Sequence, residues 1–127
     1  MAISTYLSGK LLDHTFRNTA YSSPATTYVA LYVGDPSGAG TEVSSVDTGY
    51  VRQSATFSEP SSGVISNSSA IEFPLSTDSW GTITYVAIYD ALTDGNLLAY
   101  EVLTVSRTVY INTQFIYPIG DLEITLD

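Results

Sequence analysis

Alternating hydrophobic and polar positions run through much of this chain, and the clearest run lies between Trp80 and Tyr100. Two segments rich in β-branched and aromatic residues flank the dipeptide Asp94-Gly95, which is a strong signal for a β-hairpin. The first segment is largely apolar on both faces, with Ile83, Tyr85, Ala87 and Tyr89 on one and Thr82, Thr84, Val86 and Ile88 on the other. Such a strand is typically covered on both sides, so we predict a hairpin at the centre of a β-sandwich.

The rest of the chain resembles a series of short strands separated by turns. We predict further strands at residues 26–33, 50–57, 64–73, 101–105, 109–117 and 122–126, with a turn at 106–107 and a long loop at 37–48. This spacing is typical of an antiparallel sandwich. The predicted fold class is therefore all-β, a jelly-roll-like antiparallel β-sandwich of roughly seven or eight strands with a short N-terminal helix. Its core is expected to contain Trp80, Tyr85, Ile88, Leu97 and Phe115.

A convincing helical repeat of apolar residues occurs at 3–17 alone. Its apolar face consists of Ile3, Tyr6, Leu7 and Leu11, extended by Leu12 and Phe16. Gly9 lies within the repeat and costs about 1 kcal/mol relative to alanine, so the helix is short or docked. We divide the single domain into a helix or arm at 1–21 and a β-sandwich at 22–127. The helix either covers one end of the sandwich or packs against a neighbouring subunit.

Composition restricts the partners of such a domain. The chain has 127 residues and no cysteine, which excludes disulfides and the zinc sites that depend on cysteine. Its formal net charge is −9 with four Lys and Arg residues, too few to neutralise a run of phosphates. The N-terminus lacks the features of a signal peptide, and no apolar run reaches the roughly 18–20 residues of a membrane span. We expect synthesis in the cytoplasm and no nucleic-acid or membrane partner.

Residues suited to catalysis are few. His14 is the sole histidine, and no Gly-x-Ser-x-Gly motif accompanies it, so a Ser-His-Asp triad is not expected. Asp90 and Asp94 bracket the hairpin turn and allow a calcium site, a carboxylate pair or ordinary turn chemistry. The absence of an Asp-x-Asp-x-Asp-Gly loop favours turn chemistry. We predict no enzyme activity, no metal and no cofactor.

Aromatic and cationic side chains each allow two interpretations. Trp80 and the tyrosines could form a platform that stacks against sugars, but aromatics within strands normally pack against cross-strand partners. Arg52 and Arg107 are rare cations in an acidic chain. Each can pair with a carboxylate such as Glu72 or Glu101, or form a salt bridge to another subunit. Core packing is favoured for the aromatics, and internal pairing is the simpler interpretation for the arginines.

A series of short motifs gives the chain a family resemblance. In order, these are Leu11-Leu12-Asp13-His14, Asn18-Thr19-Ala20-Tyr21, Asp35-Pro36, Gly49-Tyr50-Val51-Arg52-Gln53, Ser66-Asn67, Ile71-Glu72-Phe73-Pro74, Trp80-Gly81-Thr82 and Gly95-Asn96-Leu97-Leu98. With them the chain resembles small proteins labelled phage tail fibre protein, some relatives of which are virion structural or capsid decoration (cement) proteins. The resemblance covers nearly the whole chain and implies a virion structural protein, with no motif of catalytic residues.

From this resemblance we predict a capsid decoration protein on the outer surface of the virion, synthesised in the host cytoplasm. Its expected partners are the major capsid protein and copies of itself, most plausibly as a trimer. A receptor-binding fibre usually carries an anchoring segment and a long shaft, for which this length leaves no room. The alternative is a small tail or tail-fibre component with a glycan or receptor partner. The candidate contact residues are Ile3, Tyr6, Leu7, Leu11, His14, Arg17, Glu42, Asp47 and Arg52.

Overall fold

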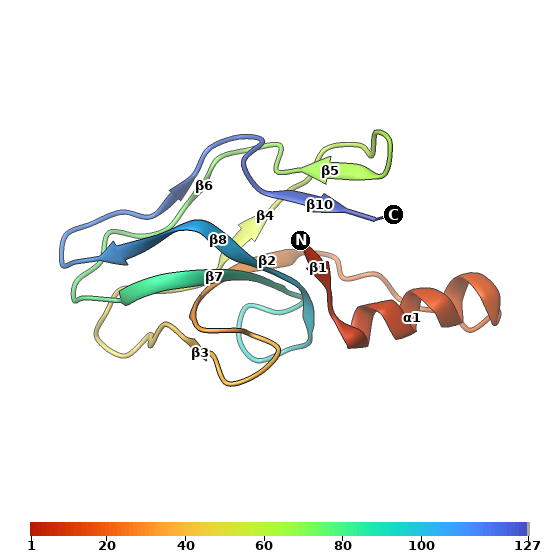
Figure 1. Ribbon diagram of the computed structural model, residues 1–127, viewed down its shortest axis with the longest axis horizontal. Coiled ribbons are helices and arrows are strands. Elements are labelled where there is room, and N and C mark those ends of the chain that lie inside the picture. The colour runs from red at the N-terminus through yellow and green to blue at the C-terminus, as the bar shows by residue number, and fades with distance from the viewer. Residues whose placement is uncertain (127) are drawn as a thin grey trace.

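The predicted hairpin forms the middle of a six-stranded antiparallel sheet in the computed structural model, which describes residues 1–126 (Figure 1). Strand β7 (Gly81–Tyr89) pairs with β8 (Leu97–Val109) on one side and with β2 (Thr27–Val33) on the other. Strand β1 (Ala2–Ile3) extends the sheet beside β8, and β3 (Thr41–Glu42) and β4 (Gln53–Ala55) extend it beside β2. Asp127, the last residue of the predicted sandwich domain, lies outside the described residues.

Two short antiparallel ribbons form the second layer. Strand β5 (Val64–Ser66) pairs with β10 (Glu123–Thr125), and β6 (Ile71–Glu72) pairs with β9 (Ile116–Tyr117). Figure 1 shows β5, β6 and β10 above the main sheet. The predicted all-β antiparallel sandwich with a short N-terminal helix is confirmed.

The main core contains three of the five predicted core residues. Trp80, Ile88 and Phe115 are buried in it, and the Trp80 indole packs edge-on against the rings of Tyr50 and Phe73. Tyr85 and Leu97 are only half-buried and pack against a smaller cluster formed by Ala30, Tyr32, Ala87 and Tyr89. Buried side chains of β7 therefore belong to two separate clusters, as the apolar character of both its faces predicts.

The hairpin differs from the predicted pattern at its bulges and in its loop. An irregularity between Ile83 and Tyr85 places Ile83 in the main core with Val86 and Ile88, whereas we expected it on the face of Tyr85. The predicted turn at 106–107 is wrong, because β8 continues to Val109 and absorbs the extra residues as a bulge. The predicted strand at 109–117 is mostly loop and retains only β9. The connection between β7 and β8 is also longer than a tight turn and spans 90–96.

Helix α1 (Thr5–Phe16) begins later than the hydrophobic repeat predicts. Ser4 is its N-cap, and the Ser4 hydroxyl accepts a hydrogen bond from the Leu7 N–H at 3.0 Å. The preceding Ala2 and Ile3 pair with Tyr100 and Ala99 of β8, so Ile3 belongs to a strand and not to the helix. Strand β1 thus fixes the start of α1 at the sheet edge, and the rest of α1 extends away from the sandwich (Figure 1).

Candidate functional site

The N-terminal arm, residues 1–21, attaches to the sandwich mainly through its first residues. Ile3, Tyr6 and Leu7 pack against the main core, yet none of the α1 residues is fully buried. Further along the helix, Leu12 is 57% exposed and Phe16 is 78% exposed. Leu12 and Phe16 are four residues apart and therefore neighbours on the helix surface. We call this pair the apolar ridge of the arm.

An apolar cleft of about 420 Å³ opens between the arm and the sandwich. The arm contributes Ile3, Leu7, Leu11 and Tyr21 to its lining, and the sandwich contributes Phe57, Pro60, Ile65, Ile124 and Leu126, among others. Its volume lies within the range of small-molecule pockets, but such pockets place several polar groups to orient the ligand. Here Tyr21 and Thr27 supply the polar side chains of the lining. The cleft is therefore better suited to apolar side chains of a protein than to a polar ligand.

Charge separates the arm from the sandwich. The arm carries Lys10 and Arg17 against Asp13, a net charge of +1, whereas the remainder carries two arginines against twelve carboxylates, a net charge of −10. The Arg17–Asp13 ion pair, at 3.0 Å, lies on the helix surface, where such pairs contribute little to stability. The Lys10 ammonium lies 5.7 Å from the centroid of the Tyr6 ring. Lys10 is two residues from Leu12 and therefore lies on the opposite side of α1, so the positive charge of the arm is not gathered at its apolar ridge.

The predicted contact residues of the arm fall on two sides of α1. Tyr6, Leu7 and Leu11 are half-buried, whereas His14 and Arg17 are exposed in its last turn and just beyond it. The His14 Nδ1 accepts a hydrogen bond from the Tyr21 N–H at 3.3 Å, which ties the returning chain to the helix. Leu12 and Phe16 were not among the predicted contact residues: their i, i+4 spacing shows that they share one strip of the helix, but it does not show that this strip is exposed.

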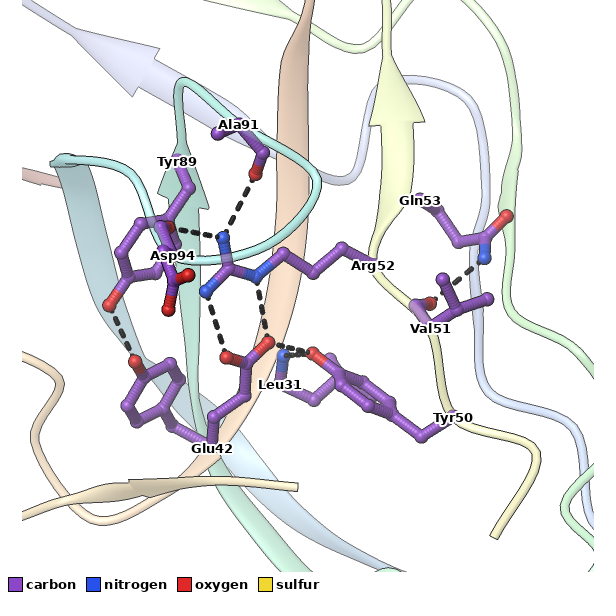
Figure 2. Close-up of polar contacts among 10 residues, drawn as sticks. Leu31, Glu42, Tyr50, Val51, Arg52, Gln53, Tyr89, Ala91 and Asp94 are labelled. Atoms are coloured by element: carbon purple, nitrogen blue, oxygen red, sulfur yellow. Dashed lines mark hydrogen bonds and ion pairs between the residues drawn. The ribbon is translucent and has the colours of Figure 1, made fainter. Parts of the chain in front are cut away.

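Arg52, the most unusual of the predicted contact residues, is turned inward. It immediately precedes β4, is 7% exposed, and donates to both carboxylate oxygens of Glu42 through Nε and NH2, each at 2.8 Å (Figure 2). Its NH1 donates to the backbone carbonyls of Ala91 at 2.9 Å and Asp94 at 2.8 Å. The guanidinium also lies 3.9 Å from the centroid of the Tyr89 ring.

These contacts correct two expectations for the arginines. Arg52 pairs with Glu42 and not with Glu72 or Glu101. Its buried guanidinium is not presented to another subunit, because all three of its nitrogens donate to acceptors within the chain. Arg107 donates to the Ile116 carbonyl at 3.1 Å and lies 4.7 Å from the Phe115 ring centroid. The Glu101 carboxylate instead pairs with the N-terminal ammonium at 3.6 Å.

Tyr50 links this ion pair to the central sheet. Its hydroxyl donates to Glu42 Oε2 at 2.6 Å and accepts from the Leu31 N–H in β2 at 3.0 Å (Figure 2). Burial and the adjacent Glu42 carboxylate raise the pKa of Tyr50 well above its ordinary value. Burial would lower the pKa of Arg52, but its hydrogen bonds to Glu42 outweigh that effect and raise it. We call Glu42, Tyr50 and Arg52 the Arg52 cluster; it is a fixed structural contact between two loops and the sheet.

The hairpin loop shows what its two aspartates do. The Asp90 carboxylate accepts from the Asn96 N–H at 2.7 Å and from Asn96 Nδ2 at 3.0 Å, and Asp94 adopts a left-handed conformation with φ of +54°. Burial would raise the pKa of Asp90, but these hydrogen bonds lower it. Both aspartates thus serve turn chemistry. Within residues 1–126, no group of three or more His, Asp or Glu side chains is arranged to hold a metal ion.

Trp80 does not form a sugar-stacking platform. It is buried, and its indole Nε1 donates to the Thr48 carbonyl at 2.8 Å.

Asp47, which precedes Thr48, is an exposed contact candidate whose φ of +57° places it at a turn in the loop. The described part of the chain contains no helix with the length and hydropathy needed to cross a membrane.

Comparison with known families accounts for nearly the whole chain. Residues 2–125 match the family described as podophage GP4 fiber I protein gp80, and the chain therefore belongs to this family. A comparison with curated proteins finds no match. The resemblance to phage fibre proteins drawn from the sequence motifs is confirmed at this level. The protein is accordingly a phage fibre-type structural protein and a component of the virion.

Proposed function

We propose, from this family membership and from the geometry of the arm, that the protein is a small fibre component that joins neighbouring virion proteins through its N-terminal arm. The observation that carries the proposal is the apolar ridge, Leu12 and Phe16, exposed beside an apolar cleft. Contiguous apolar surface that is rimmed by polar residues is characteristic of protein–protein contact sites. No catalytic step is part of this function, and the sandwich serves as a rigid support for the arm.

The energetic scale of such a contact suits assembly on a particle. Burying one Leu or Phe side chain contributes about 1.5–3 kcal/mol. Part of this gain is offset by the ordering of the partners, so a single arm gives a weak contact. Many copies on one particle, or several arms in one oligomer, multiply that contact without new chemistry.

Capsid decoration, the function predicted from the sequence, is the competing proposal. It would use the same arm, with the major capsid protein as the partner on the outer surface of the head. The family name supports fibre placement over decoration. A glycan-binding role has less support, because Trp80 and four of the ten tyrosines, Tyr32, Tyr50, Tyr89 and Tyr117, are buried, although Tyr110 is exposed.

Immunogold labelling or cryo-electron microscopy of purified particles tests the placement. We expect a few copies at the tail or at one vertex. Many copies distributed over the head would overturn fibre placement and support decoration. Absence from purified particles would contradict both proposals.

A double variant tests the role of the arm in assembly. Replacing Leu12 and Phe16 by serine should reduce incorporation into particles at least about tenfold, because two apolar side chains no longer contribute to the contact. The matched control is Val46→Ser, which removes an equally exposed apolar side chain from a loop of the sandwich. Equal incorporation of the double variant, the control and the unaltered protein would contradict arm docking.

A further inference from the structure

We infer that the apolar cleft beside the arm receives the apolar ridge of a second copy of this chain. The inference rests on the proposed arm docking and names its partner. Its first support is that ridge and cleft match in chemistry but cannot meet within one copy. Leu11 lines the cleft, whereas Leu12 lies about 100° further around the helix, and neither Leu12 nor Phe16 belongs to the lining.

The chemistry of the cleft favours a side-chain occupant of this kind. Its sandwich wall is formed by Phe57, Ile65, Ile124 and Leu126, and Leu126 is itself 60% exposed. Leu12 and Phe16 project from one strip of α1 and can enter the cleft together, as paired anchors of a helix enter an apolar groove. Insertion would cover both the ridge and the exposed lining, which a single copy leaves in contact with water.

Charge complementarity selects a second copy as the partner. The arm is net positive and the sandwich is strongly negative, so an arm is attracted to the sandwich of a neighbour, while two sandwiches repel each other. Glu59 and Glu123 are exposed and directly precede the lining residues Pro60 and Ile124 in the sequence, with Glu123 on the opposite face of β10 from Ile124. Lys10 and Arg17 supply the positive charge of the arm from other sides of α1 than the ridge. Attraction of the arm and repulsion of the sandwiches together favour arm exchange over contact between sandwich faces.

Ridge and cleft are different surfaces, which restricts the symmetry of the assembly. Each copy offers one ridge and one cleft. Every ridge and every cleft is occupied when two copies exchange arms, or when each arm in a ring enters the cleft of the next copy. An open chain would leave a ridge at one end and a cleft at the other. The inference therefore predicts a closed oligomer of defined size.

Sedimentation equilibrium of the purified full chain tests this inference directly. The unaltered protein and the control Val46→Glu should form the same oligomer, whereas Phe16→Glu and Leu126→Glu should each raise the dissociation constant at least about tenfold. Both substituted side chains are exposed, so thermal unfolding of the variants should match the unaltered chain. The inference would be overturned if the unaltered chain stayed monomeric at about 1 mM, since a dissociation constant of that size corresponds to an association free energy of about −4 kcal/mol.

A mixing experiment distinguishes ridge-to-cleft pairing from any other self-association. Phe16→Glu retains an intact cleft, and Leu126→Glu retains an intact ridge. An equimolar mixture of the two should therefore form a heterodimer through one ridge and one cleft, at a concentration where each variant alone is monomeric. A mixture that stays monomeric would overturn the pairing. The expected heterodimer should weaken as salt is added, because its charge attraction is screened.

Incorporation into particles separates failure of this inference from failure of the proposed function. If the purified chain is monomeric but Phe16→Glu is lost from particles, the arm docks on a different virion protein; the inference is then wrong and the proposed function stands. If Phe16→Glu abolishes the oligomer but not incorporation, ridge-to-cleft pairing stands and docking of the arm on the virion is wrong.

Discussion

The Arg52 cluster and the N-terminal arm differ in how completely the chain satisfies their side chains. Arg52 is 7% exposed and makes four hydrogen bonds within the chain, whereas Phe16 is 78% exposed and its ridge lies outside both core clusters. Residues of both regions were among the predicted contacts with partners, although internal pairing was the simpler interpretation for Arg52. The difference teaches that a chemically unusual residue is a poor guide to a binding surface when its partners lie within the same chain.

A physical asymmetry explains why the two regions differ. A buried cation must be compensated by its own chain, because removing charge from water without a partner costs several kcal/mol. An apolar ridge tolerates exposure at a smaller cost, and an N-cap and a docked first turn are enough to hold its helix. The Arg52 cluster should therefore control stability, and the arm should control association.

Arg52→Met gives the largest expected effect on stability. It removes the cation from the Glu42 carboxylate, which keeps the Tyr50 hydroxyl as a donor, and leaves the Ala91 and Asp94 carbonyls without their Arg52 donor. The free energy of unfolding should fall by about 3 kcal/mol. The control Arg17→Met removes an exposed ion pair and should change it by less than about 1 kcal/mol. Urea denaturation measures both. Equal losses would remove the distinction between the two regions. Should Arg52→Met fail to fold, adding Glu42→Gln should recover part of the stability.

Tyr50→Phe gives the next largest effect. The substitution leaves the buried Leu31 N–H without its acceptor and removes a donor to Glu42, at a cost of about 1–3 kcal/mol. Tyr110→Phe is the control, because Tyr110 is largely exposed. Thermal or urea unfolding of the two variants provides the measurement. A loss for Tyr50→Phe no larger than that of the control would show that the cluster is not coupled to the sheet.

Asp90→Ala should have a smaller effect that depends on pH. Loss of the hydrogen bonds to Asn96 should cost about 1 kcal/mol near neutral pH. Because folding lowers the pKa of Asp90, its contribution is fully present above the unfolded-state pKa of about 3.9 and is lost as pH falls through the lower folded-state pKa. Unfolding curves at several pH values should show the difference from the unaltered chain shrinking below about pH 4. The exposed Asp121→Ala is the control, and a difference that is constant with pH would contradict the assignment.

Local periodicity predicted the parts of the fold that depend on neighbouring residues. The apolar runs around the Asp94-Gly95 dipeptide predicted the β7–β8 hairpin, and the apolar repeat predicted α1. The bulge at Ile83 was not predictable, because it depends on how β8 aligns with β7. Ile3 was assigned to the helix for a similar reason, since pairing with β8 decides its conformation.

The candidate site was predictable only in part. The helical repeat identified Tyr6, Leu7 and Leu11, which do face the sandwich or line the cleft. The exposure of Leu12 and Phe16 depends on the direction in which α1 leaves the sheet, and no local pattern encodes that direction. Glu42 and Arg52 were each recognised, but their pairing across a loop was not, because it depends on the positions of β3 and β4 beside β2.

Gly9→Ala should have the smallest effect, and it separates the arm from the rest of the molecule. A Cβ atom at Gly9 would meet nothing within 4 Å, so alanine should stabilise α1 by about 0.5–1 kcal/mol. If the arm opens independently of the sandwich, hydrogen exchange of α1 amides should slow about two- to fivefold while the urea midpoint stays unchanged. The control Gly38→Ala is equally unobstructed but lies in a loop, so it should leave α1 exchange unaltered. An equal gain in global stability would show that arm and sandwich unfold as one unit, and the arm would then be as integral to the fold as the Arg52 cluster.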